Sequence, residues 1–360
     1  MGDVLVTKSS GSQAHIGKST LVTEEIDSLG AAYSNFMQRL RPAKSLDSKY
    51  LYYLLQSDWS RQQLALYATT TTGLANITGS QLGAIRLDDI SICEQRAIAD
   101  YLDRETARID AFIAKNEELV RLLTERRAAV LARALLKGVA RDVDLFDSRW
   151  FGKIPAHWKQ LPVKGIASRV TDGAHVSPET ENGQFDFVST RDITSGTIDF
   201  EGSLKTSPET YSYLVRTGCQ PHEGDVLYSK DGTIGETAVV TESRDFVVAS
   251  SLIIITPNPH WITPRYLRYA LSSVPLLEQA RTLVRGAGLP RISIANLATV
   301  VLPVPPLHEQ ERIVNHIETI TSAIDSATDT ARRCIGLARE RRTALISAAV
   351  TGKIDVGVAA

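Results

Sequence analysis

The sequence predicts an α/β (α+β) fold in which one kind of domain occurs twice and each copy is followed by a long helix. Three observations predict it: an internal repeat, two long segments with a heptad-like apolar pattern, and short apolar runs separated by glycine-containing turns. Of the 360 residues, 43% are hydrophobic and 22% are charged, which is ordinary for globular proteins and sufficient for a sizeable core.

The repeat is an ordered series of short matches. Residues 2–8 (GDVLVTK) reappear as 224–230 (GDVLYSK), Glu94-Gln95 matches Glu309-Gln310, and Glu125-Arg126-Arg127 matches Glu340-Arg341-Arg342. The offset falls from 222 to 215 and then stays at 215 to the ends of the helices. One match can arise by chance, but an ordered series with a nearly fixed offset indicates a duplicated module.

The two long helices are predicted by composition and spacing. Residues 94–136 contain neither proline nor glycine, and seven of ten positions stepped alternately four and three from Ile98 are apolar. At the same positions plus 215, nine of ten residues are apolar or small, and Gly138 and Gly352 follow as stops. We expect an antiparallel coiled-coil pair, each helix roughly 65 Å long, with small residues facing Phe112, Leu119 and Leu123. The alternative is that each helix packs on its own domain.

The domain boundaries follow from this pattern. They are a partial first domain at 1–92, the first long helix and its linker at 93–148, a second domain at 149–307, and the second helix with the C-terminal tail at 308–360. In the second domain, strands are predicted at 187–190, 225–228, 237–240, 246–249 and 252–256, and a helix at 264–273. The first domain repeats only the later part of the second, so it is expected to lack about 75 residues relative to its twin.

Composition and motifs exclude several classes of protein. No run of 18 apolar residues and no signal-peptide pattern occurs, and the three distant cysteines (Cys93, Cys219, Cys334) fit a reducing cytoplasm. The net charge of −1 argues against a protein that binds nucleic acid alone. Gly17-Lys18-Ser19-Thr20 ends like a phosphate-binding loop, but Ser12 stands where its first glycine is required. With no nucleophile, metal or cofactor motif, we expect no catalytic activity.

Five motifs in order resemble the specificity subunit of type I restriction–modification enzymes. They are residues 154–158 (IPAHW), 171–175 (TDGAH), 224–230 (GDVLYSK), 305–310 (PPLHEQ) and 348–354 (AAVTGKI). The resemblance covers essentially the whole chain. It implies a non-catalytic subunit whose two target-recognition domains each read one half of a bipartite DNA site, with the helices setting the unread spacer.

The resemblance also implies partners. These are double-stranded DNA, two modification (methyltransferase) subunits that carry S-adenosylmethionine and methylate adenine, and restriction (translocase/nuclease) subunits. No cofactor is expected in this chain. Two other hypotheses stay open: a degenerate scaffold that assembles modification subunits without reading both half-sites, and a self-sufficient nuclease or methyltransferase. Because half a domain cannot bury a full core, we expect residues 2–92 to recognise their half-site poorly.

Polar residues in glycine-containing loops are the candidates for DNA contacts. Arginine pairs bidentately with guanine, and lysine or hydroxyl groups hold phosphates. The alternative for each candidate is a solvated loop residue. The candidates are Lys8, Ser9, Ser10 and Lys18 in the first domain, and Arg169, Thr171, His175, Ser189, Thr190, Arg191, Ser229, Lys230, Arg285 and Arg291 in the second.

Overall fold

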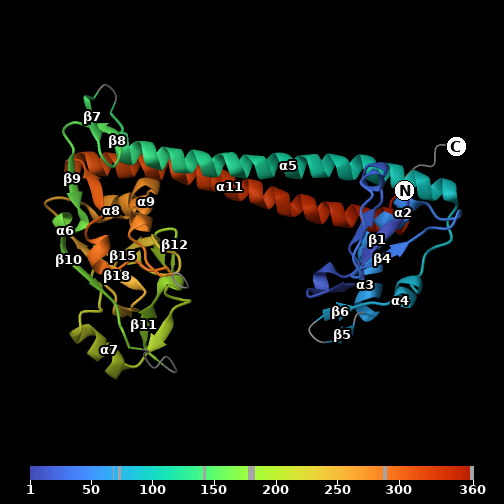
Figure 1. Cartoon of the computed structure of the whole chain (residues 1–360), viewed down its shortest axis with the longest axis horizontal. Helices are drawn as coiled ribbons and strands as arrows, with labels where there is room; N and C mark the ends of the chain where they lie inside the picture. The colour runs from blue at the N-terminus through green and yellow to red at the C-terminus, as the bar shows by residue number, and fades with distance from the viewer. Residues whose placement is uncertain (68, 72–73, 141–142, 177–182, 287–289, 357–360) are drawn as a thin grey trace. The chain divides into compact units, whose positions relative to one another are not determined.

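The computed structural model describes residues 1–67, 69–71, 74–140, 143–176, 183–286 and 290–356 (Figure 1). The chain divides into two compact units, which are considered separately below. Unit 1 comprises residues 1–121 with 328–360, and unit 2 comprises residues 122–327. The long helices α5 (Ile92–Lys137) and α11 (Leu307–Val350) each contribute one part to each unit.

Unit 2 is built around a four-stranded antiparallel sheet in the order β10-β18-β15-β16. On it pack the helices α8 (Pro264–Leu271) and α9 (Val274–Thr282), which share the largest core cluster with Val226, Tyr228 and Ile255. The central strands are continuous apolar runs because both faces of the sheet are covered: Val226 and Ile255 enter this cluster, and Leu227 and Ile254 enter another. The strands are β10 (Ala167–Asp172), β15 (Val226–Ser229), β16 (Thr237–Val239) and β18 (Leu252–Pro257).

A second, three-stranded sheet lies in the same unit, in the order β14-β11-β17. Strand β17 (Phe246–Val248) is fully buried and runs parallel to β11 (Phe185–Val188), and β14 (Leu204–Thr206) completes the sheet. Smaller elements border the sheets: β7 (Leu145–Ser148), β8 (Gly152–Pro155), β9 (Lys159–Pro162), α6 (Val163–Ile166), η2 (Thr190–Asp192), β12 (Ile193–Thr194), β13 (Thr197–Ile198), α7 (Pro208–Arg216), α10 (Ile294–Leu297) and β19 (Val301–Val304).

Unit 1 has a smaller sheet in the order β3-β1-β4 and a second in the order β2-β6-β5. Val4 and Val6 of β1 are fully buried and share a core cluster with Leu55 and Leu64. The elements are β1 (Val4–Thr7), β2 (Ser9–Ser10), η1 (Gln13–His15), β3 (Ser19–Leu21), α1 (Glu24–Ser28), β4 (Met37–Leu40), α2 (Ser48–Gln56), α3 (Asp58–Tyr67), β5 (Thr69–Thr71), β6 (Leu74–Asn76) and α4 (Gly79–Gly83).

The predicted elements of the second domain are confirmed, each boundary lying within two residues of its prediction. The ends of β11 and α8 shift by two residues, and β11 ends at Val188 rather than at residue 190. There Ser189 begins a tight turn, because the Asp192 carboxylate accepts hydrogen bonds from both the backbone N–H and the hydroxyl of Ser189, at 2.7 and 2.9 Å. A local side-chain cap therefore overrides the β propensity of the residues that follow.

The two long helices are also confirmed as helices, and both end at the predicted glycines. Gly138 and Gly352 have φ values of 70° and 66°, the left-handed conformation that glycine adopts without a steric penalty after a helix. In unit 1, Ile98 and Leu102 of α5 share an apolar cluster with Ile346 of α11.

Phe112 faces the small residues Cys334 and Ala338 as expected, but Phe112 and Leu119 are not closely packed. These side chains remain 48% and 43% exposed. Opposite Phe112, Cys334 and Ala338 are too small to fill the space, and a groove of about 480 Å³ remains between the helices within unit 1. Ion pairs join the helices beside it, including Arg342 to Asp110 at 2.9 Å.

No helix in the described ranges contains an apolar stretch long enough to cross a membrane. The three cysteines are free thiols, and the described residues include no group of three or more histidine, cysteine or acidic side chains placed to hold a metal ion.

Candidate nucleic-acid interface

Loops from both sheets of unit 2 meet at one edge. Strands β10 and β15 both run antiparallel to β18, so the ends of β10 and β15 lie beside the beginning of β18. The backbone N–H of Ala249 donates to Val188 O at 2.8 Å, which brings the end of β11 to the same place. We call residues 172–176, 189–192, 229–232 and 249–251 the loop edge.

Glycine is required at one point of the loop edge. A Cβ atom on Gly173 would lie 2.1 Å from the carbonyl oxygen of Val248 and 2.3 Å from that of Ala249. The chain after β10 therefore passes directly against the backbone that follows β17. This close approach holds Asp172 and His175 in place beside the loops from β15 and β18.

Asp172 joins two of the predicted residues. Its Oδ2 atom accepts a hydrogen bond from His175 Nε2 at 2.9 Å and one from Lys230 Nζ. His175 is 68% exposed, whereas the side chain of Lys230 is only 6% exposed. His175 is thus free to meet a ligand, while Lys230 is buried and holds Asp172 in position.

Two arginines border a groove next to the loop edge. The groove has a volume of about 560 Å³ and is lined by Arg285, Gly286, Arg291, Ser293 and Asn296. Arg285 and Arg291 pair through their backbones, and the Arg291 guanidinium donates to Asp231 Oδ2 at 2.8 Å. The N–H of the next residue donates to the carbonyl of Lys230 at 2.9 Å, so the groove is tied to the loop edge. We call it the arginine groove.

The third group of predicted residues follows β11. Ser189 and Thr190 are half-buried, and the Thr190 N–H donates to Ser251 Oγ at 3.3 Å. Arg191 is exposed on the same turn. The structure therefore brings this turn together with the loop after β17.

Three predicted residues have other surroundings. Ser229 is fully buried, and its hydroxyl donates to the carbonyl of Asp231 at 3.1 Å. Arg169 lies near the opposite end of β10, 3.7 Å from the buried carboxylate of Asp225. Thr171 is half-buried and is the last residue but one of β10. Their side chains support the sheet and the turn rather than the exposed surface of the loop edge.

In unit 1 the predicted residues lie around a smaller groove. Lys8 and Ser9 line it together with Asn35, Phe36, Asn76, Ile77, Thr78 and Gly79, and its volume is about 460 Å³. Ser10 lies on β2, where it pairs with Ala75. Lys18 is exposed, and its carbonyl accepts from the Thr7 N–H at 2.9 Å in the neighbouring turn.

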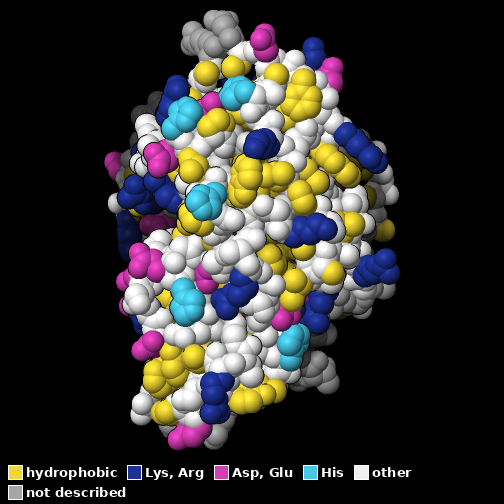
Figure 2. Space-filling view, turned by 90° about the vertical axis from the view of Figure 1, so that its left-hand side faces the viewer, with side chains coloured by type: hydrophobic (Ala, Val, Ile, Leu, Met, Phe, Trp, Pro, Cys, Tyr) yellow, Lys and Arg dark blue, Asp and Glu magenta, His cyan; other side chains and the backbone are white. Residues whose placement is uncertain are grey.

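Basic side chains do not form one continuous patch on the face that Figure 2 shows. Lysine and arginine are spread singly there among apolar and uncharged side chains. This distribution agrees with a net charge of −1.

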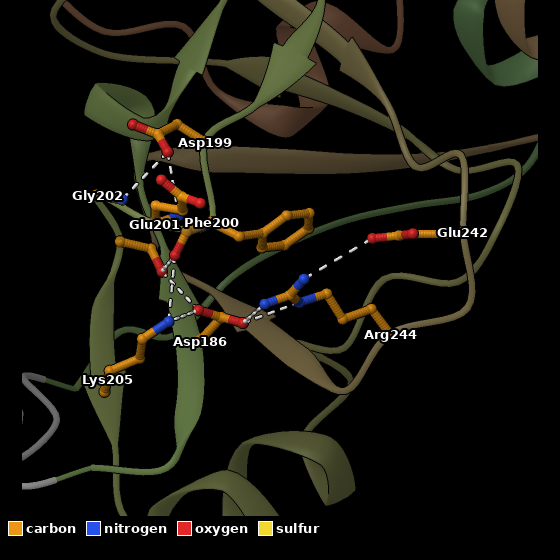
Figure 3. A network of polar contacts seen from close by, with 9 residues as sticks. Asp186, Asp199, Phe200, Glu201, Gly202, Lys205, Glu242 and Arg244 are labelled. Atoms are coloured by element: carbon orange, nitrogen blue, oxygen red, sulfur yellow. Dashed lines mark hydrogen bonds and ion pairs between the residues drawn. The ribbon is translucent and has the colours of Figure 1, made fainter.

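A prominent charged network of unit 2 is structural. The carboxylate of Asp186 is 5% exposed and accepts hydrogen bonds from Ser203 Oγ at 2.7 Å, Arg244 Nε at 3.0 Å and Lys205 Nζ (Figure 3). Burial alone would raise the pKa of Asp186, but the hydrogen bonds from these three partners hold it below its usual value. Acidic side chains at 199, 201 and 242 surround the network, so it is a poor site for phosphate.

The acidic side chains that orient the candidates were not among the residues predicted from the sequence. Asp172 and Asp231 each hold a basic residue of the loop edge or the arginine groove, and Ser293 and Asn296 line that groove. Both aspartates stand directly before a glycine in a turn, and this was the available signal. Which cation each one holds depends on contacts between distant segments, which no local pattern reveals.

The two units repeat the same internal contacts. The Ile77 N–H donates to Lys8 O at 2.8 Å in unit 1, as the Ile292 N–H donates to Lys230 O at 2.9 Å in unit 2. In both units a buried glutamine at the start of a long helix, Gln95 or Gln310, makes three hydrogen bonds to backbone groups at equivalent positions.

Residues 156–331 match the family model of the type I restriction modification DNA specificity domain. The specificity subunit of the type I restriction enzyme EcoBI of Escherichia coli is 23% identical over 277 residues, which cover 73% of this chain and 57% of that subunit. The EcoKI specificity subunit of Escherichia coli strain K12 is 21% identical over 361 residues, which cover 98% of this chain and 75% of that subunit. The chain thus spans little more than half the length of the EcoBI subunit.

Solved structures show the same fold. A chain from a structure concerned with complex assembly and conformational transition of the type I R-M system gives a TM-score of 0.75 at 17% identity, covering 98% of this chain and 82% of that chain. The HsdS subunit from Thermoanaerobacter tengcongensis gives a TM-score of 0.53 at 18% identity, covering 98% and 81%.

Proposed function

We propose that this chain is the DNA-recognition subunit of a type I restriction–modification methyltransferase complex. Two findings support this: residues 156–331 match the family of type I restriction modification DNA specificity domains, and the curated relatives are specificity subunits. Specificity subunits are the non-catalytic members of such systems. The expectation that the chain itself carries no catalytic site agrees with this relationship.

The observation that carries the proposal is the convergence of polar side chains at the loop edge of unit 2. His175, Arg191 and Arg285 are exposed there or in the adjoining arginine groove, and Arg291 is held in the groove by Asp231. Arginine at the rim of a groove is suited to guanine edges and to phosphates. Buried Lys230 and Ser229 then act as supports that position the exposed residues.

Unit 1 supports a second reader. The register of its main sheet repeats that of unit 2: Val4 lies opposite Leu21 and Leu40, as Val226 lies opposite Val239 and Ile255. Together with the repeated hydrogen bonds, this register favours a duplicated domain in which Lys8 and Ser9 occupy the positions of Lys230 and Asp231. Each domain would read one half of a bipartite site, and the helices α5 and α11, as an antiparallel coiled coil, would set the spacer.

The remaining activities belong to partners. Modification subunits, two per complex, would hold S-adenosylmethionine and methylate adenine, and restriction subunits would join where cleavage occurs. This division fits a chain of net charge −1, because partner subunits can supply the phosphate contacts that make DNA affinity depend on salt.

A methylation map tests the proposal. The chain is expressed with its modification subunit in a host free of adenine methylation, and N6-methyladenine is located by long-read sequencing. A bipartite, asymmetric motif is the expected result and means that both units read DNA. A symmetric motif means that two copies of unit 2 do the reading. An assembled complex without methylation refutes the proposal and leaves a degenerate scaffold.

A matched variant links the result to the site. Replacing both Arg285 and Arg291 by glutamine is expected to abolish or relax one half of the motif and leave the other half unchanged, because both residues lie in unit 2. Loss of neither half would mean that the arginine groove does not contact DNA.

A further inference from the structure

Strand β4 of unit 1 has a free outer edge within the described part of the chain. The sheet of unit 1 stops at β4, whereas the matching sheet of unit 2 continues from β18 to β10. Leu40 of β4 and Ile255 of β18 occupy the same place, since each lies opposite the matching valine of the central strand. The outer edge of β4 is therefore equivalent to the edge that β10 covers in unit 2.

Apolar side chains are exposed in the segment that precedes β4 in the sequence. Leu29, Tyr33 and Phe36 are 73%, 48% and 49% exposed. Residues 31–33 stand at an offset of 215 from β17, whose three residues are fully buried beside β11. Unit 1 thus exposes a stretch whose counterpart in unit 2 is covered by the segment that also supplies β10.

The two units also differ in the ion pair at the end of β10. Lys8 is the counterpart of Lys230, which pairs with Asp172 at the end of β10. Among the residues that the structure describes, Lys8 has no acidic partner. An acidic group is therefore missing from unit 1 at the position where β10 supplies one in unit 2.

At the other end of the added strand's position, unit 1 already supplies a charged partner of its own. In unit 2, Arg169 of β10 approaches Asp225. In unit 1, the matching Asp3 already accepts two hydrogen bonds from Arg41, one from Nε and one from Nη2, both at 2.8 Å. These bonds lower the pKa of Asp3 and keep it ionised. A strand added to β4 needs no cation at the position of Arg169, and a cation there would face Arg41.

We propose that unit 1 binds an added polypeptide strand that runs antiparallel to β4 and pairs an acidic side chain with Lys8. The register of unit 2 sets its position: the residue equivalent to Val170 lies opposite Leu40, and the residue equivalent to Asp172 lies opposite Gln38. The occupant is a polypeptide segment with the pattern of residues 163–176 and an uncharged residue in place of Arg169. Such a strand satisfies the backbone groups of an open sheet edge. This inference goes beyond the proposed function and does not require DNA.

The test uses the full chain and synthetic peptides. The probe has the sequence of residues 163–176 with the change Arg169→Ser, and amide hydrogen exchange is followed by mass spectrometry. We expect exchange over Met37–Leu40 to slow in a saturable manner, while exchange over Leu252–Pro257 stays unchanged because β10 already covers it. A probe that keeps arginine at this position is expected to bind more weakly, because it faces Arg41.

A charge cycle identifies the partner of Lys8. The further change Asp172→Asn in the probe is expected to weaken binding about two- to fivefold, the effect of one exposed ion pair. With the Lys8→Gln chain, the Asp and Asn probes are expected to bind equally. Unchanged exchange over Leu252–Pro257 in this variant shows that unit 2 is intact.

Three results would overturn the inference. The first is no protection of β4 at millimolar probe. The second is equal binding of the Asp and Asn probes to the unaltered chain. The third is that β4 is protected from exchange when no probe is present and that this protection decreases on dilution. That result would assign the edge to a second copy of the chain. None of these results bears on the methylation motif, so the two proposals fail separately.

Discussion

The buried glutamine at the start of α11 offers a sharp test of how the long helix is attached to unit 2. Gln310 is fully buried, and its Oε1 accepts from the Thr263 N–H at 2.9 Å. Its Nε2 donates to the carbonyls of Trp261 and Pro305, both at 2.8 Å. The change Gln310→Met keeps the size of the side chain and removes all three hydrogen bonds.

The magnitude follows from the number of bonds. Each buried hydrogen bond contributes about 0.5–1.5 kcal/mol, and its loss leaves a backbone group without a partner. Three bonds therefore stabilise unit 2 by about 3 kcal/mol, a large part of the about 5–15 kcal/mol typical of a folded protein. We expect Gln310→Met to lower the free energy of unfolding of unit 2 by about this amount and to leave unit 1 unchanged.

Amide hydrogen exchange measures the two units separately. Peptides from Leu252–Pro257 report on unit 2, and peptides from Val4–Thr7 report on unit 1. The change Gln95→Met should give the opposite pattern, since Gln95 makes the equivalent three bonds in unit 1. Exposed Gln184 provides a control, for which methionine should change stability by less than about 0.5 kcal/mol. A loss below about 1 kcal/mol for Gln310→Met would refute the reasoning.

Three further predictions follow from charged side chains. Replacing Arg285 and Arg291 together by glutamine should make the DNA affinity of the complex less dependent on salt. The slope of log affinity against log salt concentration should fall in magnitude by about 2, if each guanidinium contacts one phosphate. An unchanged slope in filter binding would exclude these phosphate contacts. Asp186→Asn should destabilise unit 2 by about 2 kcal/mol at pH 7, because the carboxylate loses hydrogen bonds from charged partners. The pKa of Asp186 is lower in the folded than in the unfolded chain, where it is about 3.9. The carboxylate therefore stabilises the fold above the unfolded pKa, and this stabilisation is lost as the pH falls through the folded pKa. In urea unfolding, the difference in free energy of unfolding between Asp186→Asn and the parent should shrink below about pH 4. Arg342→Gln, which breaks an exposed ion pair between the long helices, should cost less than about 1 kcal/mol in thermal unfolding.

The order and kind of the main elements follow from local patterns in the sequence. The strands of unit 2 and the two long helices were predictable because side-chain periodicity and glycine stops act over a few neighbouring residues. Gly138 and Gly352 end their helices as predicted, since their left-handed conformation is a local property. The repeat of residues 2–8 at 224–230 likewise anticipated that both segments form the same strand and turn.

Which of the predicted site residues reach the surface depends on how distant segments pack together. Lys230 and Arg291 look equivalent in the sequence, yet Lys230 is buried against Asp172 while Arg291 borders a groove. The exposed state of Phe112 was likewise not predictable, because it depends on the space left by Cys334 and Ala338 on another helix. Burial and ion pairing are set by segments far apart in the chain, and local pattern carries no information about their distance.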